Sequence, residues 1–347
     1  MAGTTAKKQP AKKSAAKKSK VRAKSAPPKL RNYGERTSTA EKAASLKEVY
    51  RTIGKEKVRI TNSTKIYWPK EKITKGEVID YYQSVSKYIL PYLKDRPQSL
   101  KRNPNGILDK GFYHKNAGEE APDFVKTISL YSPSSDRDVE YLVCNDAATL
   151  AYMNNLGCIE LNPWHSTLKS LDKPDYLVLD IDPSPKNDAA QIIETARAIH
   201  DVLLQAGADS YCKTSGASGL HIYVPTSKKY TYDQVRDFAQ IVCSIAHDSV
   251  ESFTSMERNL KKRGNRIYLD YLQNGQGQTI ASVYSLRPYP NASASTPLDW
   301  KEVKAGLVFA DHNIKSLPAR LAKKGDLFKA VLGKGIDLRK CLKNLGA

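Results

Sequence analysis

The sequence has few cysteines and no long hydrophobic run. Its cysteines are scattered, and no two have CxxC spacing; they are Cys144, Cys158, Cys212, Cys243 and Cys341. That pattern supports neither a zinc site nor a disulfide framework and is typical of a reducing, intracellular environment. No stretch approaches the ~20 consecutive apolar residues that a transmembrane helix requires. We therefore expect a cytoplasmic protein with no membrane partner.

Acidic residues are missing from the first 32 positions, which hold nine lysines and two arginines. The whole chain carries 56 Lys and Arg against 36 Asp and Glu, a formal net charge of +20. Without the eleven basic residues of that segment, 45 remain against 36 acids, so the rest is still basic by about +9. Both parts would attract a polyanion such as DNA, because neutralising its phosphates releases counterions.

The basic segment, which we extend to residues 1–45, has almost nothing apolar to bury, and we expect it to be disordered. It could serve as a tether that concentrates the protein on DNA, or only as a solubilising arm. No apolar stretch follows its charges, so it does not have the pattern of a secretory signal peptide. Import into an organelle stays an open alternative, although the excess of lysine is unusual for a transit peptide.

The remaining sequence mixes helix and strand signals, and we divide it into a body at 46–303 and a C-terminal extension at 304–347. A short helix at 39–50 is expected before the ordered body, which begins near Val58. Thr74 and Glu77 have capping-box spacing and start a helix that Pro91 ends. Further helices are expected at 146–155, 188–205 and 232–249, and strands at 158–161, 176–181, 210–213, 220–224, 267–271 and 279–284. This mixture predicts an α/β or α+β body rather than a doubly wound parallel sheet.

Two aspartates, Asp180 and Asp182, end the clearest strand, in the segment LDIDP. Because strand side chains alternate, both carboxylates face one side while Leu179 and Ile181 pack on the other. Carboxylates so close repel each other unless a cation lies between them, and hard oxygen ligands suit Mg²⁺ or Mn²⁺. The pattern alone is weak, because strands that end in a polar turn, glycosyltransferases and nucleases also carry it.

A third aspartate, Asp270, ends another apolar strand and could complete a two-metal site. Between the two strands, the segment KTSGASGLH at 213–221 could bring backbone N–H groups close to phosphate, with His221 beside them. Arg263, Arg266 and Arg287 bracket Asp270 and could grip phosphates. Each feature alone also fits an ordinary surface strand, a hairpin turn or surface arginines. Their combination and order carry the inference.

These motifs occur in an order that resembles a known family. The segments LDIDP, TSGASGLHIYVP, RIYLDYLQN and YSLRP are similar to the polymerase domain of bacterial ATP-dependent DNA ligase D, in the archaeo-eukaryotic primase superfamily. ITNSTKIYWPKEKITKGEVIDYY, RPQSLKRNPNG, GFYHKN and LGCIELNPWHS extend the similarity over residues 58–300. The resemblance implies an α+β primase-like fold, with an RRM-like catalytic sheet and a smaller N-terminal α/β lobe.

The resemblance also implies roles for individual residues. The catalytic carboxylates, which would hold two Mn²⁺ or Mg²⁺ ions, match Asp180, Asp182 and Asp270. The nucleotide contacts match Ser215, His221, Gln273 and Arg287, and we add Lys213 and Arg263 as candidates. A histidine beside the metal site matches His165. A pocket for the downstream 5′-phosphate of a gap or break matches Lys65, Lys75 and Arg102. An aromatic pair that stacks on template bases matches Phe112 and Tyr113.

Two departures from the family pattern matter. Ser218 stands where the family usually has lysine, so one phosphate contact is absent. The sequence also has no KxDG ligase nucleophile motif and no room for ligase or nuclease domains. We therefore expect a stand-alone polymerase, whose basic tail could supply the DNA affinity that fused domains otherwise give.

The sequence thus predicts a template-dependent nucleotidyltransferase that extends a DNA 3′ end at gaps or breaks, in gap-filling repair or non-homologous end joining. Its expected partners are DNA with a downstream 5′-phosphate and NTP or dNTP substrates, with Ku and a separate DNA ligase as further candidates, and it would be nucleoid-associated. Two alternatives stay open. A metal-dependent nuclease would use the same carboxylates without a triphosphate pocket, and a non-catalytic break-binding protein would keep only the phosphate pocket.

Overall fold

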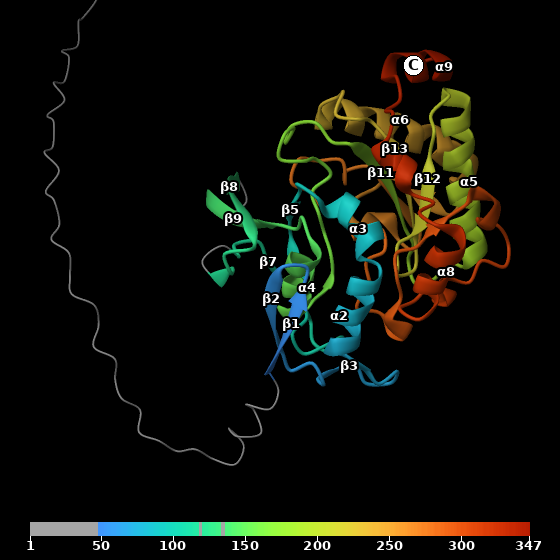
Figure 1. The fold of residues 1–347 in the computed structure, drawn as a ribbon. Helices are drawn as coiled ribbons and strands as arrows, with labels where there is room; N and C mark the ends of the chain where they lie inside the picture. The colour runs from blue at the N-terminus through green and yellow to red at the C-terminus, as the bar shows by residue number, and fades with distance from the viewer. Residues whose placement is uncertain (1–47, 118–119, 133–135) are drawn as a thin grey trace, which may run out of the picture. The chain divides into compact units, whose positions relative to one another are not determined.

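The computed structural model describes residues 48–117, 120–132 and 136–347 (Figure 1). The basic tail and most of the helix expected at 39–50 lie outside these residues. Where that helix overlaps the described chain it is wrong, because Glu48–Ile53 forms strand β1, paired antiparallel with β2 (Glu56–Thr61). Val58 and Ile60 of β2 are buried, so the hairpin is held by packing that a local helical pattern does not reveal.

A six-stranded sheet forms the centre of the described chain, in the order β14-β15-β11-β13-β12-β16. The strands are Thr254–Ser255 (β14), Ile267–Asp270 (β15), Tyr176–Asp182 (β11), Leu220–Pro225 (β13), Tyr211–Thr214 (β12) and Pro297–Leu298 (β16). All neighbours are antiparallel except β14 and β15. The predicted α+β class is confirmed, and strands expected at 176–181, 210–213, 220–224 and 267–271 are found within a residue.

Alternate side chains of β11 pack into two different cores. Leu177, Leu179 and Ile181 belong to a cluster with α5 (Ala189–Ala206) and α6 (Tyr232–Val250). Tyr176 and Val178 belong to the other cluster, with α2 (Lys75–Ser84) and α3 (Ser86–Leu93). Figure 1 shows α5 on one side of β11 and β13, and α2 and α3 on the other. Asp180 and Asp182 continue the second face, toward the N-terminal lobe.

Besides the β1–β2 hairpin, three small sheets and three helices make up the N-terminal lobe in the described ranges. The sheets are β3 (Ile66–Trp68) with β4 (Ile73–Thr74); β10 (Cys158–Glu160), β6 (Leu100–Arg102) and β7 (Phe112–His114); and β5 (Pro97–Gln98), β9 (Arg137–Val143) and β8 (Lys126–Ser132). The third helix is α4 (Ala147–Asn155), capped by Asp146. Thr74 and Glu77 form the predicted capping box of α2.

The single helix that we expected Pro91 to end is instead two helices. The break falls at Val85, and Pro91 lies inside α3. Proline lacks one N–H and so costs α3 a backbone hydrogen bond. Burial of Ile89, Tyr92 and Leu93 holds the helix despite that loss.

The strand expected at 279–284 is also wrong. Thr279 forms an isolated bridge with Trp164, and the following residues bond to different segments: the N–H of Ser282 donates to Leu161 and that of Tyr284 to Ser295. The apolar residues are buried as expected, but no single strand lies alongside them. The apolar residues of this segment therefore indicated correctly that it is buried, but they did not indicate a strand.

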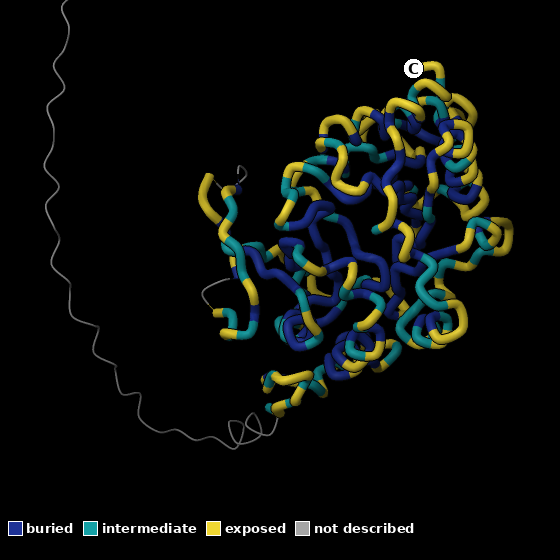
Figure 2. Tube along the Cα trace, turned by 45° about the horizontal axis from the view of Figure 1, so that its top comes forward, coloured by how far each residue is buried: buried dark blue, intermediate teal, exposed yellow. Residues whose placement is uncertain are grey.

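The remaining elements are short helices in the C-terminal third: α7 (Leu260–Arg263), η2 (Pro290–Ala292), η3 (Trp300–Glu302), η4 (Phe309–Asp311), α8 (Ser316–Lys324), η5 (Lys329–Leu332) and α9 (Leu338–Leu345). Phe328 and Val331 pack into the core beside Tyr223. Figure 2 shows the buried residues gathered in the interior and the exposed ones along outer helices and loops. Within the described ranges, no helix combines the length and apolarity needed to cross a bilayer.

Candidate active site

Three aspartates share one face of the central sheet. In the antiparallel pairing of β11 with β15, Asp180 lies directly opposite Asp270, and Asp182 lies opposite Tyr268. Residues directly opposite in such a pair point to the same side, and so do residues two apart on one strand. The neighbours Leu179 and Ile181 are fully buried on the other side. The alternation inferred from LDIDP is therefore confirmed.

These carboxylates crowd one another. Burial, followed by repulsion from Asp182 and Asp270, raises the pKa of Asp180 to about 7. Burial also raises the pKa of Asp182 and of Asp270. The closest cation to Asp182 is Arg263, with Nη1 4.0 Å from the carboxylate, and its guanidinium also lies 4.4 Å from the centre of the Tyr268 ring. Negative charge held together in this way favours a bound cation.

The donor set fits a hard divalent ion such as Mg²⁺ or Mn²⁺, which prefers carboxylate oxygens. One carboxylate of the three already has protein donors: Asp270 accepts from the Leu272 N–H at 2.9 Å and the Gln273 amide at 3.3 Å. Among the described residues, no three His, Cys, Asp or Glu side chains converge on one point as they lie. The aspartates thus supply suitable chemistry on one face without forming a closed three-ligand cluster.

A cavity of about 220 Å³ opens over Asp180 and Asp182, and we call it the aspartate cavity. The predicted residues on its wall are Asp180, Asp182, Ser215, His221, Gln273, Arg287 and Tyr113. Further lining residues include Ala217 and Gly219 of the predicted segment 213–221, and also Glu160, Asn162, Ile280 and Tyr289, which the sequence did not single out. Asp270, Arg263, Lys213 and His165 are not on that wall. Ser218, at the position where the family usually has lysine, is on it.

The loop between β12 and β13 is organised by Ser215. Its hydroxyl accepts from the N–H groups of Ala217 and Gly219, both at 3.0 Å. Those donors are thus satisfied inside the loop, rather than turned to a phosphate as we expected. The glycines allow close packing: a Cβ at Gly219 would lie 2.1 Å from the Ile181 carbonyl, and one at Gly216 (φ +75°) would lie 2.7 Å from Arg287.

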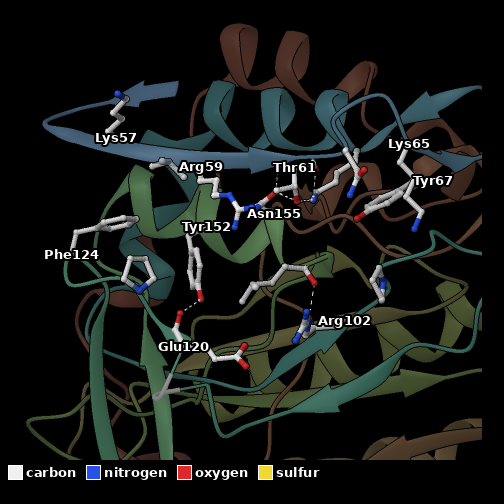
Figure 3. A pocket seen from close by; sticks show the side chains of 16 residues that line it. Lys57, Arg59, Thr61, Lys65, Tyr67, Arg102, Glu120, Phe124, Tyr152 and Asn155 are labelled. Carbon is white, nitrogen blue, oxygen red and sulfur yellow. Dashed lines mark hydrogen bonds between the residues drawn. The ribbon is translucent and has the colours of Figure 1, made fainter. Parts of the chain in front are cut away.

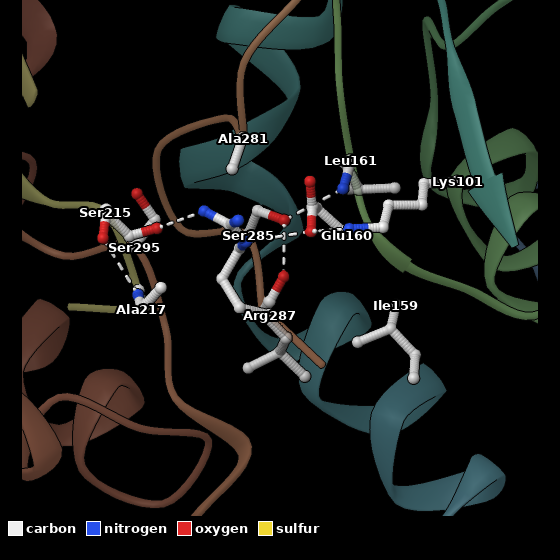
Figure 4. Close-up of polar contacts among 12 residues, drawn as sticks. Lys101, Ile159, Glu160, Leu161, Ser215, Ala217, Ala281, Ser285, Arg287 and Ser295 are labelled. Carbon is white, nitrogen blue, oxygen red and sulfur yellow. Dashed lines mark hydrogen bonds and ion pairs between the residues drawn. The ribbon is translucent and has the colours of Figure 1, made fainter. Parts of the chain in front are cut away.

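Arg287 is fixed between this loop and β10 (Figure 4). Its Nε lies 2.9 Å from the Glu160 carboxylate, and its Nη1 donates to the Ser215 carbonyl at 2.8 Å. Lys101 meets the same Glu160 oxygen at 3.2 Å. The Glu160 side chain is only 5% exposed, so this pairing is well desolvated and directional. One feature of the sequence could have indicated Glu160, because it is an acid within the apolar strand CIE.

Lys213 lies behind His221 rather than beside the cavity. The amine of Lys213 is fully buried, lies 2.7 Å from His221 Nδ1, and donates to the Ala281 carbonyl at 3.0 Å. Burial and the Lys213 charge lower the pKa of His221 well below its usual value, which keeps the ring neutral. His221 Nε2 lies 3.4 Å from Asp180. The His221 ring thus lies between the Lys213 amine and the Asp180 carboxylate.

His165 is buried beside the Tyr176 ring, with 5.5 Å between ring centres. Burial, with repulsion from Arg96 and Lys213, lowers its pKa to about 3. Neither ring nitrogen bonds to a residue of the described chain. This contact lies at the start of β11, four residues before Asp180, and His165 does not line the aspartate cavity.

A second cavity, of about 570 Å³, brings together the three residues expected to bind a 5′-phosphate (Figure 3). Lys75 donates to the Thr61 carbonyl at 2.6 Å, Arg102 donates to the Leu156 carbonyl at 2.8 Å, and Lys65 contacts the Asn105 side chain. Burial, with repulsion from Lys65 and Arg102, lowers the pKa of Lys75 to about 8.

One small sheet reaches both cavities. On β6, Arg102 lines the larger cavity, while its neighbour Lys101 contacts Glu160 at the aspartate cavity. On β7, Phe112 pairs with Arg102 and Tyr113 with Lys101. Phe112 and Tyr113 are 49% and 61% exposed, as a base-stacking platform requires. Tyr113 is also part of the aspartate cavity wall.

Comparison with known proteins gives a consistent result. A family model described as "LigD, primase-polymerase domain" matches residues 74–328. Over 270 residues the chain is 34% identical to the bifunctional non-homologous end joining protein LigD of Bacillus subtilis, covering 78% of this chain and 43% of that protein. It is 29% identical over 297 residues to the multifunctional LigD of Pseudomonas aeruginosa, covering 85% and 34%. The chain therefore spans less than half the length of either relative.

A solved structure, the polymerase domain from Mycobacterium tuberculosis ligase D in complex with DNA, matches with a TM-score of 0.73. The sequences are 25% identical, and the match covers 80% of this chain and 98% of that one. The family model covers most of the chain, including all three aspartates and Arg287. The chain thus belongs to the LigD primase-polymerase domain family, a family of nucleotidyltransferases.

Proposed function

We propose that the chain is a template-dependent polymerase that adds nucleotides to a DNA 3′ end at gaps or breaks and recognises the downstream 5′-phosphate. One observation carries this proposal: side chains of a single three-stranded sheet reach both the aspartate cavity and the cationic cavity. An enzyme that fills a gap must hold the incoming nucleotide and the far edge of the gap at the same time. A nuclease has no need of the second cavity.

In this proposal Asp180, Asp182 and Asp270 would hold two divalent cations. When bound, such ions activate the attacking 3′-hydroxyl and neutralise charge on the leaving pyrophosphate. Arg287 binds the triphosphate, and the Glu160 carboxylate keeps its guanidinium in one orientation.

The neutral His221 ring can offer a hydrogen bond without adding charge beside the cations. Gln273 borders the same cavity, and its carbonyl oxygen is buried without a partner in the described chain, so it can accept from a nucleotide. Lys213 contacts the Nδ1 atom of His221 and so holds the ring in its orientation. The exposed pair Phe112 and Tyr113 stacks on template bases at the cavity edge.

The relatives named above act in non-homologous end joining, and we propose that setting, or gap-filling repair, for this chain. The basic tail would then raise the local concentration of DNA in a salt-sensitive way. Ku and a DNA ligase are the candidate partners, since an extended end still has to be held and sealed.

The test is extension of a labelled primer across a short gap, with Mn²⁺ or Mg²⁺ and either ribo- or deoxyribonucleotides. We expect templated addition that disappears in the double variant Asp180→Ala/Asp182→Ala and weakens when the downstream 5′-phosphate is removed. Metal-dependent shortening of the primer would replace this proposal with a nuclease. Binding of DNA without any reaction would replace it with a break-binding scaffold.

A further inference from the structure

The cavity that holds Lys65, Lys75 and Arg102 is far larger than a phosphate group. Its volume is about 570 Å³. In Figure 3, Lys65 and Arg102 lie toward one end of the cavity, and the rings of Tyr152 and Phe124 lie toward the other. A phosphate site alone leaves this aromatic end without a function.

Helix α4 connects the two ends. At the phosphate end, the Asn155 side chain accepts from the Thr61 N–H at 2.9 Å, and the Thr61 carbonyl accepts from Lys75. Arg102 reaches the carbonyl of Leu156, the next residue. Tyr152 lies three residues before Asn155 on the same helix, so the two side chains are neighbours ~5–6 Å apart at Cβ. That spacing is comparable to the separation of phosphate and base within one nucleotide.

The Tyr152 ring is held in place by two contacts. The Tyr152 hydroxyl donates to the Glu120 carbonyl at 3.2 Å, and its ring meets Phe124 edge-on, with centres 6.4 Å apart. Figure 3 shows Tyr152 projecting into the cavity between Arg59 and Glu120. A ring held at its hydroxyl and edge leaves a face for stacking, and every nucleobase can stack on such a face.

The charge of the lining also suits a nucleic acid strand. Five basic side chains line the cavity against one acid, Glu120. Two of the basic residues, Lys57 and Arg59, lie on β2 and are not among the three phosphate-binding candidates. Arg59 is paired with Glu48 at 2.7 Å, whereas the Lys57 amine lies 5.1 Å from the centre of the Tyr50 ring. Lys57 is therefore the residue of β2 whose charge is more available to a backbone phosphate.

We propose that this cavity binds a complete nucleoside 5′-phosphate at a DNA end, with the terminal phosphate at Lys75 and the unpaired base on Tyr152. The protein would then prefer downstream ends whose last base pair is open. This inference rests on the proposed 5′-phosphate recognition and adds the base to it.

Binding of four gapped substrates to the full chain tests the inference, measured by fluorescence anisotropy. Their downstream ends carry a 5′-phosphate on a mismatched nucleotide, a paired nucleotide or an abasic residue, or a 5′-hydroxyl on a mismatched nucleotide. We expect the phosphorylated mismatched end to bind about five- to a hundredfold more tightly than the abasic one, the range of base–aromatic stacking.

Substitutions at Tyr152 distinguish the loss of the aromatic ring from general damage to the fold. Tyr152→Leu should abolish the preference for a base but keep the preference for a phosphate, and Tyr152→Phe should keep both. Tyr131→Leu, at an exposed tyrosine on β8, is the matched control and should change neither. Equal affinity for mismatched and abasic ends in the unaltered protein, or the same loss in Tyr152→Leu and Tyr131→Leu, would overturn the inference. Indifference to the 5′-phosphate itself would instead overturn the proposed function.

Discussion

Replacing Asp180 by asparagine should stabilise the metal-free protein while abolishing its activity. Asp180 faces Asp270 directly across β11 and β15, and like charges so placed destabilise a sheet by about 0.2–1 kcal/mol. Asp182 adds a second repulsion on the same face, and the Asp180 side chain is only 17% exposed, so its charge is partly desolvated. Asparagine keeps the shape without the charge. We expect Asp180→Asn to raise the free energy of unfolding in EDTA by about 1–2 kcal/mol.

The same change should lower kcat/KM for nucleotide addition by about a thousandfold or more, because charge stabilisation by a bound ion is worth several kcal/mol. Urea unfolding followed by tryptophan fluorescence, in EDTA and in Mn²⁺, measures the stability part. Mn²⁺ should stabilise the unaltered protein by mass action and the variant much less.

Asp201→Asn is the matched control, since it removes the same charge from an exposed position on α5. It should shift neither the EDTA stability nor the response to Mn²⁺. If Asp180→Asn instead destabilised the protein in EDTA, the carboxylate would be held by protein contacts, and the reasoning from crowded charge would fail.

Other changes probe the nucleotide and phosphate sites. Arg287→Lys should raise KM for the nucleotide about tenfold in steady-state extension. Lysine cannot contact Glu160 and Ser215 together as the planar guanidinium of arginine does. An unchanged KM would contradict that role. Ser218→Lys should lower the same KM severalfold by adding a cation to the cavity wall, and no change would mean that the side chain does not reach the phosphates. Lys75→Gln should remove the rate gain given by a downstream 5′-phosphate. In the unaltered protein that gain should decline as pH rises through about 8, where the free amine loses its proton; a flat profile from pH 7 to 9 would exclude Lys75 as the phosphate ligand.

Much of the fold could be predicted from the sequence, because its local signals agree with the packing. Caps at Thr74, Asp146 and Asp188 mark helix starts correctly, and the apolar strand that ends in Asp180 is the central strand. The errors fall where tertiary contacts override local pattern. Pro91 is tolerated inside a helix whose other side chains are buried, and the segment 279–284 is apolar without being a strand.

The site could be predicted only in part, for a similar reason. Strand alternation places Asp180 and Asp182 on one face without any knowledge of the fold. The role of Glu160 depends on its ion pair with Arg287, 127 residues away in sequence. No local sequence pattern predicts such a contact. The glycines of the 215–219 loop were expected to admit a phosphate, yet Gly219 allows close packing against Ile181.

The arrangement of β6 supports the proposal that the two cavities act on one substrate. Lys101 and Arg102 are consecutive, so strand geometry sends their side chains to opposite faces. Lys101 is joined through Glu160 to Arg287, while Arg102 lines the second cavity. The separation of the two sites is then set by covalent geometry and one buried ion-pair chain, with no flexible linker between them. The proposed function therefore predicts that a substrate filling both cavities must match that spacing, so that the length of the gap should affect binding.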